Sequence, residues 1–260
     1  AARKAYDALV RTWHESPQAP AAQLACAKLL EERGDDLDAF NEFQYLIDHF
    51  AGRFSFEEAL DHQFRIANTV MTQRHGRFLF GGYLAPERAL PLFEQIVKNG
   101  PQWKRSAQAQ FNVGLIYEES EEYDDAIKAY EVVSVAYADD TSAAEAAFRR
   151  ARCLYTLVND NRRNEPAYRD ALSALTLFLR DYPRSANAET AARYRDELKE
   201  RLARMYFDRA LYYDRIVKRP KSAVIAYADF IRNFPMSELA AQAGDRMDAL
   251  QLEQEKSHEK

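Results

Sequence analysis

The chain has 260 residues and a formal net charge of −5, and this length allows one or two domains. The negative charge argues against a nucleic-acid-binding protein, because such proteins usually carry a basic face. The sequence contains no apolar run near the roughly 20 residues that a membrane-spanning helix needs. Hydrophobic residues make up 47% of the chain, with only 8 glycines and 9 prolines, and this composition predicts an all-α protein.

The first residues, AARKAYDALV, already have a helical pattern and do not begin with Met. We expect the natural N-terminus to lie upstream, so that a signal peptide or a lipid anchor would precede these residues. The two cysteines, Cys26 and Cys153, lie far apart within helical patterns. We expect two buried reduced thiols, because a disulfide would need a proximity that the sequence does not indicate.

A short pattern recurs along the chain, and its clearest copies end in FLRDYPRS at 178–185 and FIRNFPMS at 230–237. In each copy a small residue is followed by large residues four and seven positions later, and by proline or alanine after twelve. The first three positions lie on one helix face, and proline then ends the helix. The six copies have Pro17, Ala51, Pro101, Ala138, Pro183 and Pro235 in the last position.

Between these helices lie partner helices, and residues 107–130 contain the clearest pair. Within this pair, Gly114, Tyr117, Ala126 and Tyr130 fall on signature positions of the tetratricopeptide repeat. We therefore predict an all-α, tetratricopeptide-repeat-like superhelical solenoid of helical hairpins.

Two segments depart from the repeat. The stretch 72–86 is rich in glycine and aromatic residues, and we expect either a loop or short helix over a hydrophobic edge, or a lip that binds a partner. The stretch 187–217 contains no glycine or proline and predicts one long C-terminal helix of roughly 45 Å. Its charged residues lie largely off its apolar stripe, on a face that is either solvated or used for docking.

Residues 108–250 resemble the last repeats of the BamD family of outer-membrane lipoproteins, which belong to the β-barrel assembly machinery. The resemblance lies in a YP-x-S turn, a long helix with Arg201-Leu202-Ala203 and later Tyr212-Tyr213, and a second FP-x-S turn. On this basis we expect N-terminal repeats over 1–105 with the insertion at 72–86, BamD-like repeats over 106–250, and a flexible charged tail over 251–260.

The resemblance implies a non-enzymatic scaffold in the periplasm, held at the outer membrane through a lipid on upstream residues. Its C-terminal repeats would bind the periplasmic part of the barrel-forming subunit, and its N-terminal groove would receive unfolded outer-membrane protein segments. The C-terminal binding residues that it implies are Arg201, Arg204, Tyr212 and Tyr213.

One helix of each hairpin lines the concave side of such a solenoid. The expected lining contains aromatic and arginine side chains, which are typical of interface hot spots. Packing within the repeat is the alternative role for each of them. These candidates are Phe111, Asn112, Phe148, Arg149, Arg152 and Tyr155.

The five histidines are scattered and form no HExxH pair, and the sequence has no G-x-S-x-G motif. We therefore expect no catalytic residues, no metal and no cofactor. The alternative function is a general tetratricopeptide adaptor for another protein complex, either periplasmic or cytoplasmic.

Overall fold

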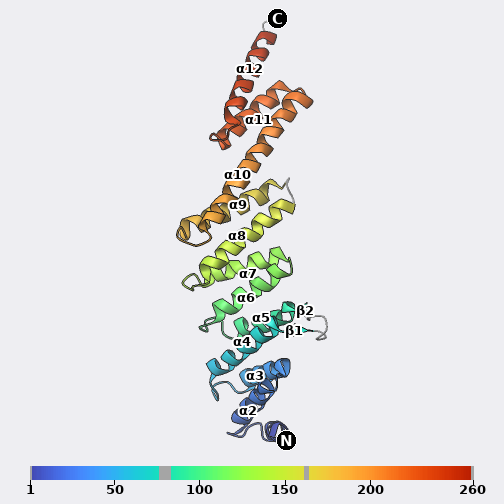
Figure 1. Ribbon diagram of the computed structural model, residues 1–260, viewed down its shortest axis with the longest axis vertical. Coiled ribbons are helices and arrows are strands. Elements are labelled where there is room, and N and C mark those ends of the chain that lie inside the picture. Colours follow the sequence, from blue (N-terminus) through green and yellow to red (C-terminus); the bar gives the residue numbers. More distant parts are fainter. Residues whose placement is uncertain (1, 76–82, 161–163, 259–260) are drawn as a thin grey trace. The chain divides into compact units, whose positions relative to one another are not determined.

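The structure is a computed structural model that describes residues 2–75, 83–160 and 164–258. The chain divides into two compact units, Ala1–Cys153 and Leu154–Lys260, and the division falls within one helix, α8 (Ala143–Asp160). Helices that follow one another as hairpins build both units (Figure 1). The predicted all-α fold of tetratricopeptide-like hairpins is confirmed.

Unit 1 contains the hairpins α2–α3 and α6–α7, and a third pair, α4 and α5, that carries the insertion. Helix α1 packs against α2, α3 against α4, and α5 against α6, so that each hairpin rests on its neighbour. The helices are α1 (Ala2–Thr12), α2 (Ala19–Glu32), α3 (Asp36–His49), α4 (Phe56–Thr72), α5 (Leu90–Asn99), α6 (Ser106–Glu119) and α7 (Tyr123–Ala136).

Unit 2 contains the long helix predicted for 187–217, and this helix is confirmed as α10 (Ala188–Leu211). Its last turn continues as a π-helical segment, η3 (Tyr212–Ile216), in which the backbone accommodates one extra residue. Helix α10 packs against α9 (Glu165–Asp181) and α11 (Pro220–Asn233), and α11 packs against α12 (Ala240–His258).

The repeated pattern forms the core of the hairpins. In the five copies that end at Ala51, Pro101, Ala138, Pro183 and Pro235, the small residue and both large residues are buried. In each of these copies the helix ends two residues before the proline position, whether that position holds proline or alanine. Proline is therefore compatible with this helix end but is not required for it.

Five turns between hairpins share one backbone geometry. The N–H of the residue after the helix bonds to the carbonyl four residues back, as Tyr182 does to Phe178 at 2.8 Å. Two further bonds follow, each from an N–H to the carbonyl three residues back. In this example the Ser185 N–H bonds to the Tyr182 carbonyl, and the Ala188 N–H bonds to the Ser185 carbonyl. The residues that begin these turns are Trp13, Gly100, Tyr137, Tyr182 and Phe234.

The serine of the two quoted phrases also has a structural role in these turns. The hydroxyl oxygen of Ser185 accepts a hydrogen bond from the N–H of Asn187 at 3.2 Å, and that of Ser237 accepts one from Leu239 at 3.3 Å. The phrases therefore encode the end of one helix and the turn into the next.

The predicted register of the first copy was wrong by three residues. Because Trp13 begins the first turn, the proline position of this copy is His14 and not Pro17. Ala5 and Thr12, which the predicted register placed on the buried face, are exposed. Helix α1 packs against α2, and most of its described side chains are exposed.

The turns inside hairpins use a left-handed residue. Gly34 has φ 76° between α2 and α3, Glu121 has φ 61° between α6 and α7, and Lys218 has φ 55° between η3 and α11. At Gly34 and Glu121 the following N–H reaches the carbonyl five residues back. After Lys218 the N–H of Arg219 reaches six residues back, to Tyr213, because the π-helical turn holds one more residue.

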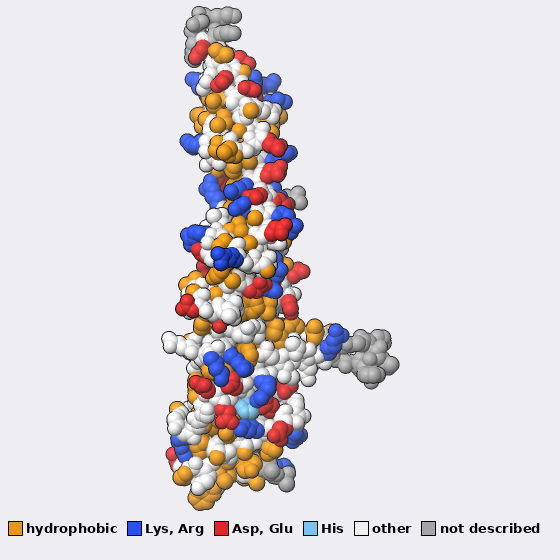
Figure 2. Space-filling view, turned by 60° about the vertical axis from the view of Figure 1, so that its left-hand side comes forward, with side chains coloured by type: hydrophobic (Ala, Val, Ile, Leu, Met, Phe, Trp, Pro, Cys, Tyr) orange, Lys and Arg blue, Asp and Glu red, His pale blue; other side chains and the backbone are white. Residues whose placement is uncertain are grey.

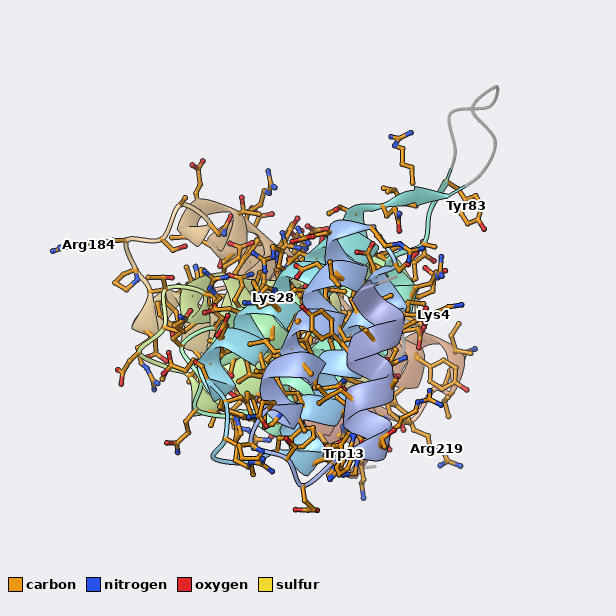
Figure 3. The ribbon with its side chains drawn as sticks, turned by 90° about the horizontal axis from the view of Figure 1, so that it is seen from below. Lys4, Trp13, Lys28, Tyr83, Arg184 and Arg219 are labelled. Atoms are coloured by element: carbon orange, nitrogen blue, oxygen red, sulfur yellow. The ribbon has the colours of Figure 1, made fainter. Side chains whose placement is uncertain are left out.

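The insertion at 72–86 begins and ends in short regular elements, and its expected role, either a cover over a hydrophobic edge or a lip that binds a partner, stays a prediction. Two short antiparallel strands, β1 (Arg74–His75) and β2 (Tyr83–Leu84), lead into and out of it, with Arg74 opposite Leu84. A 3-10 helix, η2 (Pro86–Ala89), then joins α5. Tyr83, labelled in Figure 3, is exposed at the base, and so is Leu84. The central residues, 76–82, lie outside the described residues.

Cys26 and Cys153 are both buried thiols, as expected. The expected tail at 251–260 is helical as far as its described residues extend, because α12 continues to His258. Among the helices that the structure describes, none has the length and apolar character needed to cross a membrane.

Candidate protein-interaction surfaces

Three of the predicted lining residues are buried inside unit 1. Phe111 and Asn112 on α6 are 8% and 5% exposed, and Phe148 on α8 is 4% exposed. The Phe111 ring lies 5.5 Å from the Tyr130 ring on α7. The Asn112 amide donates to Asn68 on α4 at 3.3 Å. These contacts fit the packing role that was the alternative for each residue.

Arg149 and Arg152 converge on one carboxylate, Glu118, at the end of α6. Arg149 donates to Glu118 at 3.0 Å and Arg152 donates through Nε at 3.1 Å, while the Tyr130 hydroxyl donates at 2.7 Å. Arg149 also pairs with Glu145 at 2.8 Å. Two predicted binding arginines are therefore held in an ion-pair cluster that ties α8 to the α6–α7 hairpin.

The cluster shifts the pKa values of its members. Burial alone would raise the pKa of Glu118, but hydrogen bonds from Tyr130, Arg152 and Arg149 outweigh it and hold the pKa below its ordinary value. Burial, together with the hydrogen bond to Glu118, raises the pKa of Tyr130. Burial and the negative charge of Glu118 raise the pKa of Cys153 to about 12, so this thiol stays protonated and unreactive.

Tyr155 and Arg201 form a second group, within unit 2. The Tyr155 ring stacks on Tyr194 of α10 with centroids 4.2 Å apart, and its hydroxyl donates to Glu197 at 2.7 Å. Arg201 pairs with the same Glu197 and also donates to Asn159. The side chains of Tyr155 and Arg201 therefore join α8 to α10 within unit 2.

Arg204 is placed differently, because it is exposed and has no ion-pair partner among the described residues. It lines a cavity of about 650 Å³ between α9, α10 and the turn from α11 to α12. Apolar residues of the second quoted phrase line the same cavity, and Met236 at its rim is 96% exposed. We call this cavity the C-terminal groove; its lining is Leu172, Lys199, Glu200, Ala203, Arg204 and residues 233–239.

Tyr212 and Tyr213 lie on the π-helical turn η3, with their ring centroids 5.9 Å apart, and Tyr212 is 53% exposed. The next residue, Asp214, is buried and accepts two hydrogen bonds from Arg246 of α12, at 2.9 and 2.8 Å. The Tyr227 hydroxyl also donates to Asp214, at 3.3 Å. The hydrogen bonds from Arg246 hold the pKa of Asp214 below its usual range. This ion pair fastens α12 to the turn that presents the two tyrosines.

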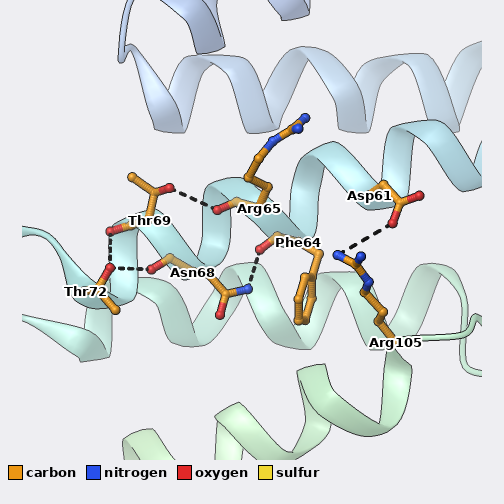
Figure 4. A pocket seen from close by; sticks show the side chains of 7 residues that line it. All are labelled: Asp61, Phe64, Arg65, Asn68, Thr69, Thr72 and Arg105. Carbon is orange, nitrogen blue, oxygen red and sulfur yellow. Dashed lines mark hydrogen bonds and ion pairs between the residues drawn. The ribbon is translucent and has the colours of Figure 1, made fainter.

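Unit 1 contains a second cavity, of about 640 Å³, on the face of α4 (Figure 4). Asp61 and Arg105 form an ion pair across it at 3.8 Å, and Arg105 lies over the Phe64 ring at 5.4 Å. We call it the α4 groove; its lining is Asp61, Phe64, Arg65, Asn68, Thr69, Thr72 and Arg105. Asn68 of this groove accepts the hydrogen bond from Asn112, which is one of the predicted binding residues.

The repeated sequence pattern does not indicate Glu118, Asp214, Arg246 or the α4 groove. The first three have no motif of their own, because each acquires its role from a partner on another helix. The α4 groove did have a signal, since Asp61, Arg65, Asn68, Thr69 and Thr72 recur at helical spacing along one face of α4.

Charged side chains of both signs alternate with apolar ones on the surface in view in Figure 2. In the ranges that the structure describes, no group of histidine, cysteine, aspartate and glutamate side chains is arranged to hold a metal ion.

The repeated hairpins, with their shared turns and buried positions, define the class of the protein as a tetratricopeptide-repeat interaction scaffold. Residues 86–249, well over half of the chain, match the model of the YfiO family, described as outer membrane lipoprotein. The chain belongs to this BamD-like family, and the resemblance stated from its sequence is confirmed. No curated protein matched the chain.

Several solved structures are similar to the chain at low identity. A kinesin light chain repeat protein of Podosopora anserina is 14% identical, with a TM-score of 0.36, over 92% of this chain and 98% of that one. The apo form of RapI is 15% identical, with a TM-score of 0.39, over 98% and 70%. The C-terminal part of a repeat protein from Cytophaga hutchinsonii is 16% identical, with a TM-score of 0.38, over 93% and 92%. No inference about partners follows from these likenesses.

Proposed function

We propose that the protein is a non-enzymatic scaffold of the outer-membrane β-barrel assembly machinery, acting in the periplasm at the outer membrane. The observation that carries this proposal is the family match over residues 86–249. This match includes every residue that lines the C-terminal groove. The C-terminal groove would bind the periplasmic part of the barrel-forming subunit.

The chemistry of the C-terminal groove supports a protein partner. Arg204 offers planar donors that no carboxylate of the described chain occupies, and arginine is enriched among residues that dominate binding energy. Met236 adds an exposed flexible side chain, and such side chains adapt to a partner surface. Tyr212 and Tyr213 lie on η3, which continues the α10 helix that carries Arg204, and they extend the proposed contact.

The α4 groove is the proposed site for unfolded outer-membrane protein segments. The hydroxyls of Thr69 and Thr72 donate to carbonyls of their own helix, at 3.1 and 2.9 Å, which leaves their oxygens able to accept hydrogen bonds. An extended peptide presents main-chain N–H groups that match these acceptors. Arg65 pairs with Glu31 through Nε at 2.7 Å and Arg105 pairs with Asp61 at 3.8 Å, and the remaining N–H groups of the two guanidinium groups can donate to carbonyl or carboxylate groups of the peptide.

The test measures the affinity of the whole chain for the purified periplasmic domains of the barrel-forming subunit. Arg204→Glu should weaken this binding by about tenfold or more, since reversing a hot-spot charge removes donors and adds repulsion. Arg184→Glu is the matched control, because Arg184 is exposed on a turn of the same unit (Figure 3) and does not line the groove.

Binding that Arg204→Glu weakens and Arg184→Glu preserves would support the docking proposal. Binding that neither variant changes would move the contact away from the C-terminal groove. Failure of the unchanged chain to bind these domains would favour the alternative, a general tetratricopeptide adaptor for another complex.

A further inference from the structure

The turn that joins η3 to α11 concentrates positive charge. Four cations lie within seven residues, all four are exposed, and none of them forms an ion pair within the described residues. The only acidic residue between positions 209 and 228 is Asp214, whose carboxylate is buried against Arg246. We call this surface the basic corner; it consists of Arg215, Lys218, Arg219 and Lys221.

Two aliphatic side chains are exposed beside these cations. Ile216 is 70% exposed on η3, and Ile225 is 64% exposed on α11, and these two elements pack against each other. Lys221 and Ile225 are four residues apart on α11 and therefore share a helix face. Figure 3 shows the Arg219 side chain extending away from the ribbon. The corner thus alternates cations with exposed aliphatic groups, which is typical of segments that lie at a membrane surface.

The backbone conformation of Lys218, at the centre of the basic corner, is unfavourable for lysine. Lys218 has φ 55° and takes the same turn position as Gly34, where glycine meets no steric cost. Lysine at this position keeps a positive charge at the tip of the turn, at the expense of local backbone stability. Glu121 has the same conformation in the α6–α7 turn, so what distinguishes Lys218 is the group of cations on either side of it.

We propose that the basic corner binds the surface of an anionic phospholipid bilayer, with Ile216 and Ile225 entering the headgroup region. Neither the cations nor the two isoleucines line the cavities described above, so the corner offers charge and aliphatic groups rather than a pocket for a protein anchor. The family consists of outer membrane lipoproteins, for which a bilayer is close at hand. The proposal does not depend on the partner proposed for the C-terminal groove.

The test is flotation of the whole chain with vesicles of phosphatidylcholine, or of equal parts phosphatidylcholine and phosphatidylglycerol. We expect binding to the mixed vesicles only, weakening as salt is added. Each cation near an anionic surface contributes about fivefold to partitioning. The variant R215Q/K218Q/R219Q/K221Q should therefore lose binding. The control, K98Q/R180Q/R184Q/R232Q, removes four exposed cations elsewhere and should retain most of it.

Lys218→Gly separates a binding role from a structural one. It relieves the left-handed lysine, so its unfolding midpoint should rise, while its binding to mixed vesicles should still fall by about fivefold. Ile216→Ser with Ile225→Ser should remove the part of the binding that persists at high salt.

Absence of binding to the mixed vesicles, or equal loss in the control variant, would overturn the proposal. Loss of binding to an acidic protein partner in the four-glutamine variant, without any vesicle binding by the unchanged chain, would assign the corner to a protein instead.

Discussion

A Cβ atom placed on Gly114 would lie only 2.5 Å from Cε1 of Tyr130. The missing side chain lets the Tyr130 ring lie directly against α6, and the Tyr130 hydroxyl then reaches Glu118. One glycine therefore fixes both the closeness of the α6–α7 hairpin and one contact of the Glu118 cluster.

We expect Gly114→Ala to lower the free energy of unfolding by about 1–3 kcal/mol, because the added methyl group forces the buried ring to move. Denaturant unfolding measures this change. Gly244→Ala on α12 is the control, since its added Cβ would meet no atom within 4 Å and alanine favours a helix. Equal destabilisation by both substitutions would contradict the assigned role of Gly114.

Glu121→Gly should stabilise the chain by about 1 kcal/mol, because glycine adopts the left-handed conformation of this turn without steric cost. Ser120→Gly next to it should instead destabilise, since Ser120 has φ −84° and gains nothing from the change. Thermal unfolding of the two variants gives the comparison. A lower midpoint for Glu121→Gly would show that its side chain outweighs the backbone cost.

Glu118→Gln should lower the free energy of unfolding by about 1–3 kcal/mol near neutral pH, through weaker hydrogen bonds from Arg149 and Arg152. The pKa of Glu118 is lowered in the folded chain, so the folded state releases its proton more readily than the unfolded state. The stabilisation is therefore complete above the unfolded pKa of about 4.3, and it is lost as the pH falls through the folded pKa.

The measurement is the stability difference between the unchanged chain and Glu118→Gln as a function of pH. This difference should be constant near neutrality and should shrink in acid. Glu119→Gln is the control, because the neighbouring carboxylate is exposed. A difference that grows as the pH falls would reverse the assigned sign.

Asp214→Asn should loosen α12, because the buried carboxylate carries two hydrogen bonds from Arg246. We expect a loss of about 2 kcal/mol in unit 2. Hydrogen exchange should become faster in the amides of α12. Asp229→Asn removes an exposed pair with Arg232 and should leave α12 unchanged. Unaltered exchange in the Asp214 variant would mean that apolar packing alone holds α12.

The sequence predicts the hairpins well because their information is local. The buried positions around Tyr130 or Phe230 repeat at fixed offsets, and helix periodicity converts those offsets into one face. The register of the first copy could not be obtained in this way, because Pro17 suits a turn position as well as a helix end. Backbone hydrogen bonds at Trp13 determine that register, and the pattern contains no information about them.

The candidate site was less predictable. Phe111 and Phe148 are of a residue type that is common in binding surfaces, but phenylalanine is equally suited to a hydrophobic core. Both side chains are buried. Arg149 and Arg204 look alike in sequence. They differ because Arg149 pairs with Glu118 on a neighbouring helix, whereas Arg204 forms no ion pair with an acid among the described residues. Ion pairs between helices decide which arginines remain available to bind a partner. The spacing of residues along the sequence does not show these pairs.

The shared turn has a consequence for how this chain can change over evolutionary time. Two residues after the start of each of the five turns, the side chain is exposed and the fold requires no particular residue there. The residues at this position are Glu15, Gln102, Asp139, Arg184 and Met236. An acid, an amide, a base and a thioether thus occupy equivalent places, each in its own repeat. Mutation can therefore change the side chain at each of these positions separately without altering where the helices begin and end.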